Sequence, residues 1–413
     1  MTSSIAQRAA AAVDEERVIS LTQELVRIRS VYEPERGGNE REVVSHLAEV
    51  LSAMGLNPIL EEVAPGRPNL ICDWQGAHFD ARLHKTLMFE GHTDVVTEGD
   101  SSKWHHPPFE AIIAGDSLFG RGSADMKGGV AAALCALEAV KKTAPDLPGR
   151  IRLGIVVDEE GMMTGIKHFI SRGWADDVSG AIICEPEENE ICLQQKGAMR
   201  INVLVTGVMS HGAMPYAGVN PITALSELIR QVARWQQSEQ ERSGEHPFLG
   251  FPWITPTIVK APPAGEAQHN VMPAQAYMAL DVRTIPGQEH STILADLTKI
   301  AEGLEKRTPQ LTISLDCFES RPWTETPPDD PLVRAIEHVY PTVLGSSPRY
   351  GGVPGATDGT FLHASSGIPI VTLGPGDRTI PHQCDEYVRI PQLIQASRLY
   401  AAAAVTYLGP QEK

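Results

Sequence analysis

A histidine and an aspartate two residues apart stand where an apolar run of the chain stops. The run Leu87–Phe89 is followed, after one glutamate and one glycine, by His92 and then by Asp94. Side chains two positions apart in an extended chain face the same way. The pattern favours His92 as a metal ligand and Asp94 as the carboxylate that holds its imidazole in one tautomer. A surface turn capped by the aspartate is the alternative.

A glycine-dense segment, residues 120–129, carries Asp125 just before an alanine-rich stretch. Glycines allow the backbone to approach other groups closely, and a carboxylate at this place could bridge two cations. Aspartate is also a good helix cap. For this segment taken alone, the cap is the simpler interpretation.

Three consecutive acids, Asp158, Glu159 and Glu160, follow the apolar run Ile151–Val157. Carboxylates so close together repel one another unless a cation or a proton relieves them. One of them could therefore bind a metal ion while its neighbour acts as a general base. A solvated acidic loop is the alternative in a chain this acidic.

Two more candidates occur later in the chain. Glu185 follows the apolar run Ala181–Cys184, and His382 follows the glycine-rich residues 373–377. Each pattern is weak alone, but together they offer two histidines and three acids, most of them directly after strand-like runs. Imidazole and carboxylate ligands without thiolate suit Zn²⁺, Co²⁺ or Mn²⁺. A spare glutamate beside such ligands is what metal-assisted hydrolysis requires.

Strand-like and helical patterns alternate through the part of the chain that would position these residues. This alternation predicts an α/β fold with a mainly parallel central sheet and helices on both faces. Such sheets bind ligands beyond the carboxyl ends of their strands. The apolar runs are residues 69–72, 86–89, 151–157 and 181–184, and the helical patterns are residues 18–29, 39–54, 128–142 and 165–172.

The pattern changes to half-exposed strands and long helices after residue 196 and returns to the first type near residue 312. Two strand–helix units in roughly 115 residues indicate a small inserted α+β domain. The predicted organisation is therefore a catalytic domain in two parts, residues 1–195 and 312–413, with residues 196–311 inserted between them.

Composition excludes several classes of function. The formal net charge of −17 argues against nucleic acid or an anionic membrane as a partner. The six cysteines have no CxxC spacing, which favours free thiols in a reducing compartment. Residues 1–16 lack the apolar core of a signal peptide, and no apolar run has the length of a membrane span. We expect a soluble cytoplasmic protein.

Segments along most of the chain, in the same order, resemble the dinuclear zinc family that includes acetylornithine deacetylase, succinyl-diaminopimelate desuccinylase, aminoacylase and glutamate carboxypeptidase. The resemblance implies a zinc exopeptidase-like catalytic domain and an inserted lid or dimerisation domain, and hence a homodimer. The matching segments are residues 91–96, 104–109, 120–129, 158–161, 185–186, 210–220, 270–273 with 281–283, 355–361 and 382–387.

The resemblance also assigns the metal ligands. It implies that His92 and Glu185 bind one ion, that Glu160 and His382 bind the other, and that Asp125 bridges them. It further implies a cis peptide bond after Asp125. A glutamate rather than an aspartate at position 185 is closer to the deacylase and desuccinylase branch of the family.

The remaining roles come from the same resemblance. Asp94 would support the first ligand, Glu159 would be the general base, and His211 would help to hold the developing oxyanion, in its own or a partner's active site. Arg283 would bind a substrate carboxylate, for which its planar fork is suited, and Asn270 would assist. The alternative for Arg283 is a strand surface charge paired with its neighbour at position 281.

These roles predict a metal-dependent hydrolase that cleaves an amide C–N bond of a small molecule with the help of two divalent ions, Zn²⁺ first and Co²⁺ or Mn²⁺ as alternatives. The favoured reaction is deacylation of an N-acyl amino acid or a related carboxylate-bearing amide. The alternatives are a metallo-carboxypeptidase or dipeptidase, and a catabolic aromatic amide or amine hydrolase. A catalytically inactive amino-acid-binding relative is the non-enzyme alternative; it would be expected to have lost Glu159 or a ligand, and every such position is filled here.

Overall fold

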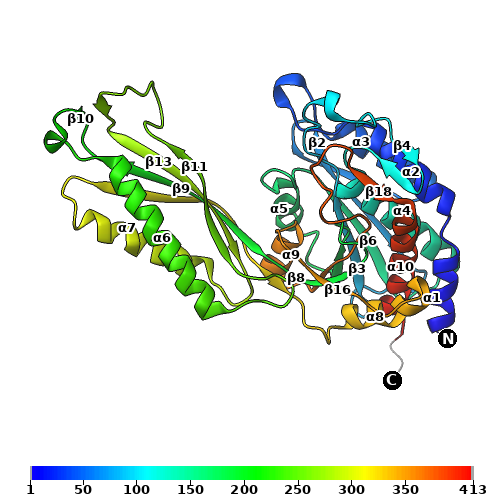
Figure 1. Cartoon of the computed structure of the whole chain (residues 1–413). Helices are drawn as coiled ribbons and strands as arrows, with labels where there is room; N and C mark the ends of the chain where they lie inside the picture. Colours follow the sequence, from blue (N-terminus) through cyan, green and yellow to red (C-terminus); the bar gives the residue numbers. More distant parts are fainter. Residues whose placement is uncertain (1, 411–413) are drawn as a thin grey trace. The chain divides into compact units, whose positions relative to one another are not determined.

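The computed structural model describes residues 2–410, which divide into two units, each with its own sheet and its own hydrophobic core (Figure 1). The larger unit contains the chain up to Leu193, Glu325–Gly352 and the chain from Thr357 onward. The smaller unit contains Gln194–Thr324 and Val353–Ala356.

A nine-stranded mixed sheet forms the centre of the larger unit. Its middle strands β6, β3, β7 and β17 run parallel, and the flanking strands β2 and β8 are antiparallel to them. This confirms the predicted α/β fold with a mainly parallel sheet. The strands, in sheet order, are β1 (Ile59–Ala64), β2 (Arg67–Gln75), β6 (Arg150–Val156), β3 (Thr86–His92), β7 (Gly180–Ile183), β17 (Ile370–Thr372), β8 (Ile191–Gln195) and β15 (Thr324–Glu325), with β16 (Tyr350–Val353) paired to β8.

Helices cover both faces of this sheet because successive residues of each buried strand point to opposite sides. In β3, Leu87 and Phe89 belong to one core cluster and Met88 to another. The first cluster is completed by α1 (Thr2–Ala11), α2 (Glu15–Arg27), α3 (Arg41–Ala53), α4 (Gly128–Thr143), α8 (Pro331–Leu344) and α10 (Ile390–Leu408). The second is completed by α5 (Thr164–Ser171) and α9 (Gly359–Ser366).

A small three-stranded sheet joins two segments that are distant in sequence. Strand β18 (Tyr387–Arg389) pairs with β5 (Ser117–Phe119), which pairs with β4 (Ile112–Ala114). The segment just after His382 is thereby fixed beside the segment just before Asp125. This pairing brings two of the candidate ligands into one region of the larger unit.

The smaller unit is an α+β structure built on a four-stranded antiparallel sheet in the order β11-β13-β9-β14. Alternate residues of β9 pack with the two long helices in one core. A separate two-stranded sheet contains His211. The elements are β9 (Gly197–Thr206), β10 (Ser210–His211), α6 (Pro221–Ser243), β11 (Trp253–Lys260), β12 (Val271–Met272), β13 (Gln275–Thr284), α7 (His290–Glu305) and β14 (Thr312–Arg321).

Strand β14 lies beyond residue 311, where the sequence predicted the inserted domain to end. It pairs with β9 along its whole length and so belongs to the sheet of the smaller unit. A half-exposed strand has the same alternating pattern in either domain, and only its pairing partner distinguishes them. The smaller unit therefore extends about one strand further than predicted.

All six cysteines are free thiols, and Cys72, Cys135, Cys184 and Cys192 are buried. Within residues 2–410 no helix combines the length and the apolar character needed to cross a bilayer.

Candidate metal centre

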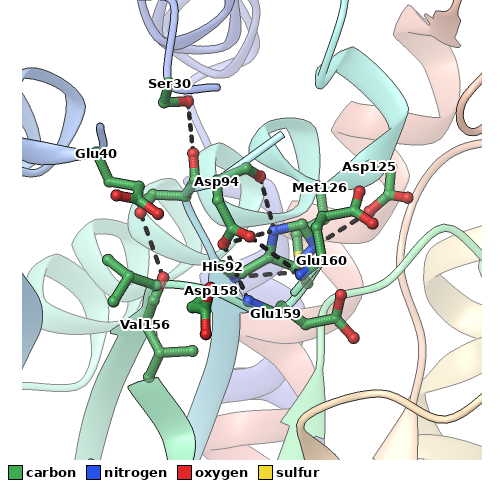
Figure 2. A network of polar contacts seen from close by, with 12 residues as sticks. Ser30, Glu40, His92, Asp94, Asp125, Met126, Val156, Asp158, Glu159 and Glu160 are labelled. Atoms are coloured by element: carbon green, nitrogen blue, oxygen red, sulfur yellow. Dashed lines mark hydrogen bonds and ion pairs between the residues drawn. The ribbon is translucent and has the colours of Figure 1, made fainter. Parts of the chain in front are cut away.

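His92 is the last residue of β3 and is almost completely buried, at 1% exposure. Figure 2 shows its ring between Asp94 and Asp125. Nδ1 lies 2.9 Å from the backbone carbonyl oxygen of Asp94. A carbonyl oxygen only accepts hydrogen bonds, so Nδ1 carries a proton and Nε2 is the nitrogen available to a metal ion in the neutral ring. Nε2 lies 3.1 Å from Asp125 Oδ1 and 3.6 Å from Glu185 Oε1.

The carboxylate of Asp94 is predicted to hold the imidazole of His92, but the backbone carbonyl of the same residue makes the closer contact. Oδ1 of Asp94 is 3.6 Å from His92 Nδ1, whereas the carbonyl oxygen is 2.9 Å from it. The two carboxylate oxygens instead accept the backbone N–H groups of Glu159, at 3.2 Å, and Glu160, at 3.0 Å. Asp94 therefore connects the end of β3 with the acidic loop after β6 (Figure 2).

Asp125 lies in the segment Ser123–Lys127 that leads into α4. Its own backbone is not helical, with φ −118° and ψ 96°, and its peptide bond to Met126 is cis, as the resemblance implied. The residue at the N-terminal cap of α4 is Lys127, and no side chain caps the helix there. The carboxylate of Asp125 faces two histidines instead, with Oδ1 3.1 Å from His92 Nε2 and Oδ2 3.4 Å from His382 Nε2. The simpler interpretation of this aspartate, a helix cap, is therefore wrong.

His382 closes the other side of the cluster. Its Nε2 lies 2.9 Å from Glu160 Oε1, and its ring is about half exposed. The structure thus brings together the five residues predicted as ligands. His92, Glu160 and Glu185 reach one another because the parallel strands β3, β6 and β7 all deliver their carboxyl ends to the same edge of the sheet. Asp125 and His382 are brought to this edge by the segments that the small sheet of β5 and β18 joins.

Glu386 anchors the segment that carries His382, a role that the sequence patterns did not assign. It is fully buried. Its Oε1 accepts the backbone N–H groups of Gly122, Ala124 and Asp125 at 3.0–3.1 Å, and its Oε2 pairs with Arg121. Glu386 lies in a segment on which the family resemblance rests, but only the fold shows what its carboxylate binds.

The glutamates of the cluster are crowded among other carboxyl groups. Burial raises the pKa of Glu159 well above its usual value, and the charges of Asp358 and Glu160 add to the shift. Burial and then the charge of Asp125 likewise raise the pKa of Glu185 well above its usual value. A divalent cation would remove this repulsion and favour the charged carboxylates.

The pKa values of Asp125 and His382 shift in the directions that favour their charged forms, unlike those of the glutamates. Burial opposes ionisation of Asp125, but hydrogen bonds from His382 and His92 hold its pKa far below the usual range. The bonds to Asp125 and Glu160 raise the pKa of His382 to about 10. The acids around His92 and His382 thus raise the pKa of both imidazoles, and a divalent cation would supply positive charge at the same place.

The donor atoms fit a pair of metal ions. Ligand atoms of His92, Asp125 and Glu160 lie within 4.8 Å of one another, and so do those of His92, Glu159 and Glu185. Imidazole nitrogen and carboxylate oxygen without thiolate are suitable for Zn²⁺ and similar divalent ions. The arrangement offers two neighbouring ligand groups with a glutamate beside them, which is the composition of a two-metal hydrolytic site.

The three other predicted residues lie in the smaller unit. His211 and Asn270 are neighbours there. His211 pairs with Val271, and Gly212, which follows His211, donates its backbone N–H to the carbonyl of Asn270. Arg283 lies near the end of β13 and pairs with Asp281, with Nε 2.7 Å from Oδ1. This pairing is the alternative that the sequence left open for Arg283.

Comparisons with known proteins agree with this geometry. The model of peptidase family M20/M25/M40 matches residues 88–406. A probable succinyl-diaminopimelate desuccinylase of Staphylococcus epidermidis is 27% identical over 416 residues, which cover 96% of this chain and 99% of that protein. Among solved structures, an M20 family metallo-carboxypeptidase of Sulfolobus solfataricus has a TM-score of 0.74 at 18% identity, covering 94% of this chain and 99% of its own. A dinuclear metal-binding peptidase of Bacillus subtilis has a TM-score of 0.69 at 16% identity, covering 95% and 98%.

Proposed function

The chain belongs to peptidase family M20/M25/M40 and is a hydrolase of amide bonds, and from that membership we propose that it removes the acyl group from an N-acyl amino acid or a related carboxylate-bearing amide. The observation that carries this proposal is the shared position of Asp125 between His92 and His382, with Glu159 close by. The similarity to a probable desuccinylase along 96% of the chain supports an acyl-amino-acid type of substrate.

His92 and Glu185 hold one metal ion in this proposal, Glu160 and His382 hold the other, and Asp125 is shared by both. The contacts of 3.6 Å between His92 and Glu185 and of 2.9 Å between His382 and Glu160 support these two pairs. Zn²⁺ is the favoured metal, with Co²⁺ or Mn²⁺ as alternatives.

When bound, the ions would lower the pKa of a water molecule and polarise the amide carbonyl. Glu159 accepts a proton from the attacking water as its oxygen bonds to the carbonyl carbon. It gives this proton to the amine nitrogen as the C–N bond breaks. Burial supports this role, because it raises the pKa of Glu159 and so strengthens the carboxylate as a proton acceptor. His211 donates a hydrogen bond to the developing oxyanion.

The dimensions of β13 support a homodimer. His211 and Asn270 lie beyond the first residue of this strand, Gln275, and Arg283 lies near its other end. At about 3.3 Å per residue these ends are roughly 26 Å apart, so His211 and Arg283 of one copy do not both contact one small substrate. In the proposed dimer, Arg283 binds the substrate carboxylate in one active site while His211 and Asn270 serve the active site of the partner. The role that the resemblance implied for Asn270, to assist Arg283, then falls to the Asn270 of the other copy, because Asn270 and Arg283 of one chain lie toward opposite ends of β13. The inserted domain supplies the contacts between the copies.

The four buried free thiols are compatible with a reducing compartment, and the cytoplasm remains the proposed location.

A hydrolysis panel tests the proposed reaction. Purified protein is supplied in turn with Zn²⁺, Co²⁺ and Mn²⁺ and offered N-acyl amino acids, dipeptides and aromatic amides. The proposal expects the highest kcat/KM on N-acyl amino acids. Turnover of peptides alone would indicate a carboxypeptidase or dipeptidase, and turnover of aromatic amides alone a catabolic amide hydrolase. No metal uptake and no turnover would favour an inactive relative.

A further inference from the structure

The loop between β6 and α5 carries both Glu159 and Glu160, and it begins with a residue in an unusual conformation. Asp158 has a φ of 69°, in the left-handed region that non-glycine residues adopt rarely. Its Oδ2 accepts the hydroxyl of Thr164 at 2.7 Å and the backbone N–H groups of Met162 and Thr164 at 3.3 and 3.2 Å. The side chain of Asp158 therefore shapes the loop that presents the proposed base.

Arg67 binds the other oxygen of Asp158. It is the first residue of β2, is 5% exposed, and donates from Nη1 to Asp158 Oδ1 at 2.8 Å. Its Nε and Nη2 donate to the carboxylate of Glu40, which is fully buried, at 2.5–3.0 Å. The guanidinium also stacks over the ring of Tyr32, 3.6 Å from its centroid. The contacts with Glu40 and Tyr32 fix the orientation of Arg67, with Nη1 directed at the acidic loop.

The loop packs tightly around this contact. A Cβ added at Gly161 would lie 2.6 Å from Asp158 Oδ1, the oxygen that Arg67 binds. Asp94 holds the backbone N–H groups of Glu159 and Glu160 (Figure 2). The loop is thus held by two groups outside it, Arg67 through the side chain of Asp158 and Asp94 through two backbone N–H groups.

A purely structural ion pair is the competing explanation, and the same sheet contains an example. Arg152 of β6 is 3% exposed and binds Asp73 and Asp177 at 2.7 Å. It has as many charged partners as Arg67, but neither partner belongs to the loop that bears the proposed base. Arg152 is therefore a suitable control for Arg67, because both are buried arginines with two acidic partners and only Arg67 binds the acidic loop.

We propose that Arg67, acting through Asp158, is a positioning residue that sets the place of the general base Glu159. The proposal rests on the proposed function, because it assumes that Glu159 transfers the proton. Glu40 and Arg67 precede residue 88, where the family match begins, so the match itself does not include them. A misplacement of a catalytic group by about 1 Å can cost on the order of 100-fold in rate, so a loosened loop has a measurable consequence.

The first experiment compares Arg67→Gln, Arg67→Lys and Arg152→Gln in the metal-loaded enzyme, with metal content measured for each. For Arg67→Gln we expect kcat to fall roughly 10- to 100-fold with KM within about twofold. Arg67→Lys keeps the charge but not the fork, so it should recover part of kcat. Arg152→Gln should lower the melting temperature and leave kcat unchanged. Equal kcat in all three variants and the wild type would overturn the proposal.

A double-mutant cycle shows whether Arg67 acts through Glu159. If it does, Arg67→Gln should reduce kcat much less in a Glu159→Asp background, where the base is already displaced, than in the wild type. The same fold-loss in both backgrounds would overturn the proposal even if Arg67 matters for activity. Full activity of Glu159→Gln would instead overturn the proposed function, so the two failures are distinguishable.

Discussion

Glu160 and His382 are 222 residues apart in the sequence, and His382 Nε2 lies 2.9 Å from Glu160 Oε1. Both side chains also lie beside Asp125, whose Oδ2 is 3.4 Å from the same nitrogen. Glu160 follows a central strand, whereas His382 lies on a loop fixed by β18 and Glu386. One half of the candidate centre is therefore built by the parallel sheet and the other half by a small sheet beside it.

Glu159→Gln should keep both metal ions and lose about three or more orders of magnitude in kcat. The amide keeps the size of the carboxylate but does not accept a proton from water. The measurements are kcat on the best substrate of the panel and metal content by elemental analysis. Glu302→Gln, an exposed substitution on α7, is the control and should behave as wild type. Near-normal turnover by Glu159→Gln would remove it from the role of base.

Metal should stabilise the protein more as pH rises. The pKa of Glu185 is raised by burial, so its stabilising contribution in the metal-free protein is present below its usual value of 4.5 and is lost at higher pH. His382, whose pKa is raised to about 10, contributes stability that is present below 6.5 and is lost as pH rises through about 10. A bound cation supplies the positive charge that these protons supply at lower pH, so its stabilising effect should grow as the protons are lost.

The check is the melting temperature with a chelator and with excess Zn²⁺. We expect the difference between the two conditions to widen from about pH 5 to about pH 8. A difference independent of pH would mean that the bound ion does not compete with these protons. Asp125→Asn should reduce the difference at every pH, because it weakens the shared ligand.

Glu386→Ala should destabilise the larger unit by about 3–5 kcal/mol, because it leaves the buried cation of Arg121 and three backbone N–H groups without their acceptor. Urea unfolding followed by circular dichroism measures the loss. Glu302→Ala breaks an exposed pair with Lys306 and should change stability by less than about 1 kcal/mol. Equal effects of the two substitutions would contradict the anchoring role of Glu386.

Arg283→Ala should raise KM for carboxylate-bearing substrates roughly 10- to 100-fold, the loss expected for one charged hydrogen-bonding partner. Neutral amide analogues of the same substrates should be affected much less. Arg230→Ala is the matched control, since Arg230 is an exposed arginine of the same unit that pairs only with Glu227 among the described contacts. An equal loss on charged and neutral substrates would show that Arg283 does not bind the carboxylate.

Mixed dimers test the proposed exchange of His211. A dimer of one His211→Ala chain and one Glu159→Gln chain contains one complete active site if His211 acts on the partner. Random mixing of the two inactive variants should then restore about a quarter of wild-type activity. A mixture of His211→Ala with Asn270→Ala should not recover, because both residues lie at the same end of the unit. No recovery in the first mixture would place His211 in its own active site.

Much of the fold could be predicted because its signals are local. Buried apolar runs followed by helical patterns predict parallel strands and helices on both faces, and the sheet has this form. The end of the inserted domain could not be predicted in this way. Strand β14 has the pattern of any half-exposed strand, and its assignment depends on hydrogen bonds to β9.

The sequence by itself determined which residues could bind metal, because imidazole and carboxylate side chains stand directly after strand-like runs, and segment order identifies the family. Only the tertiary structure decided that Asp125 faces two histidines rather than capping α4. It also decided that Arg67 holds the acidic loop and that Arg283 pairs with Asp281. The physical reason is that ligand chemistry belongs to each side chain, whereas which groups meet depends on strand order and register, which the local pattern of residues does not encode.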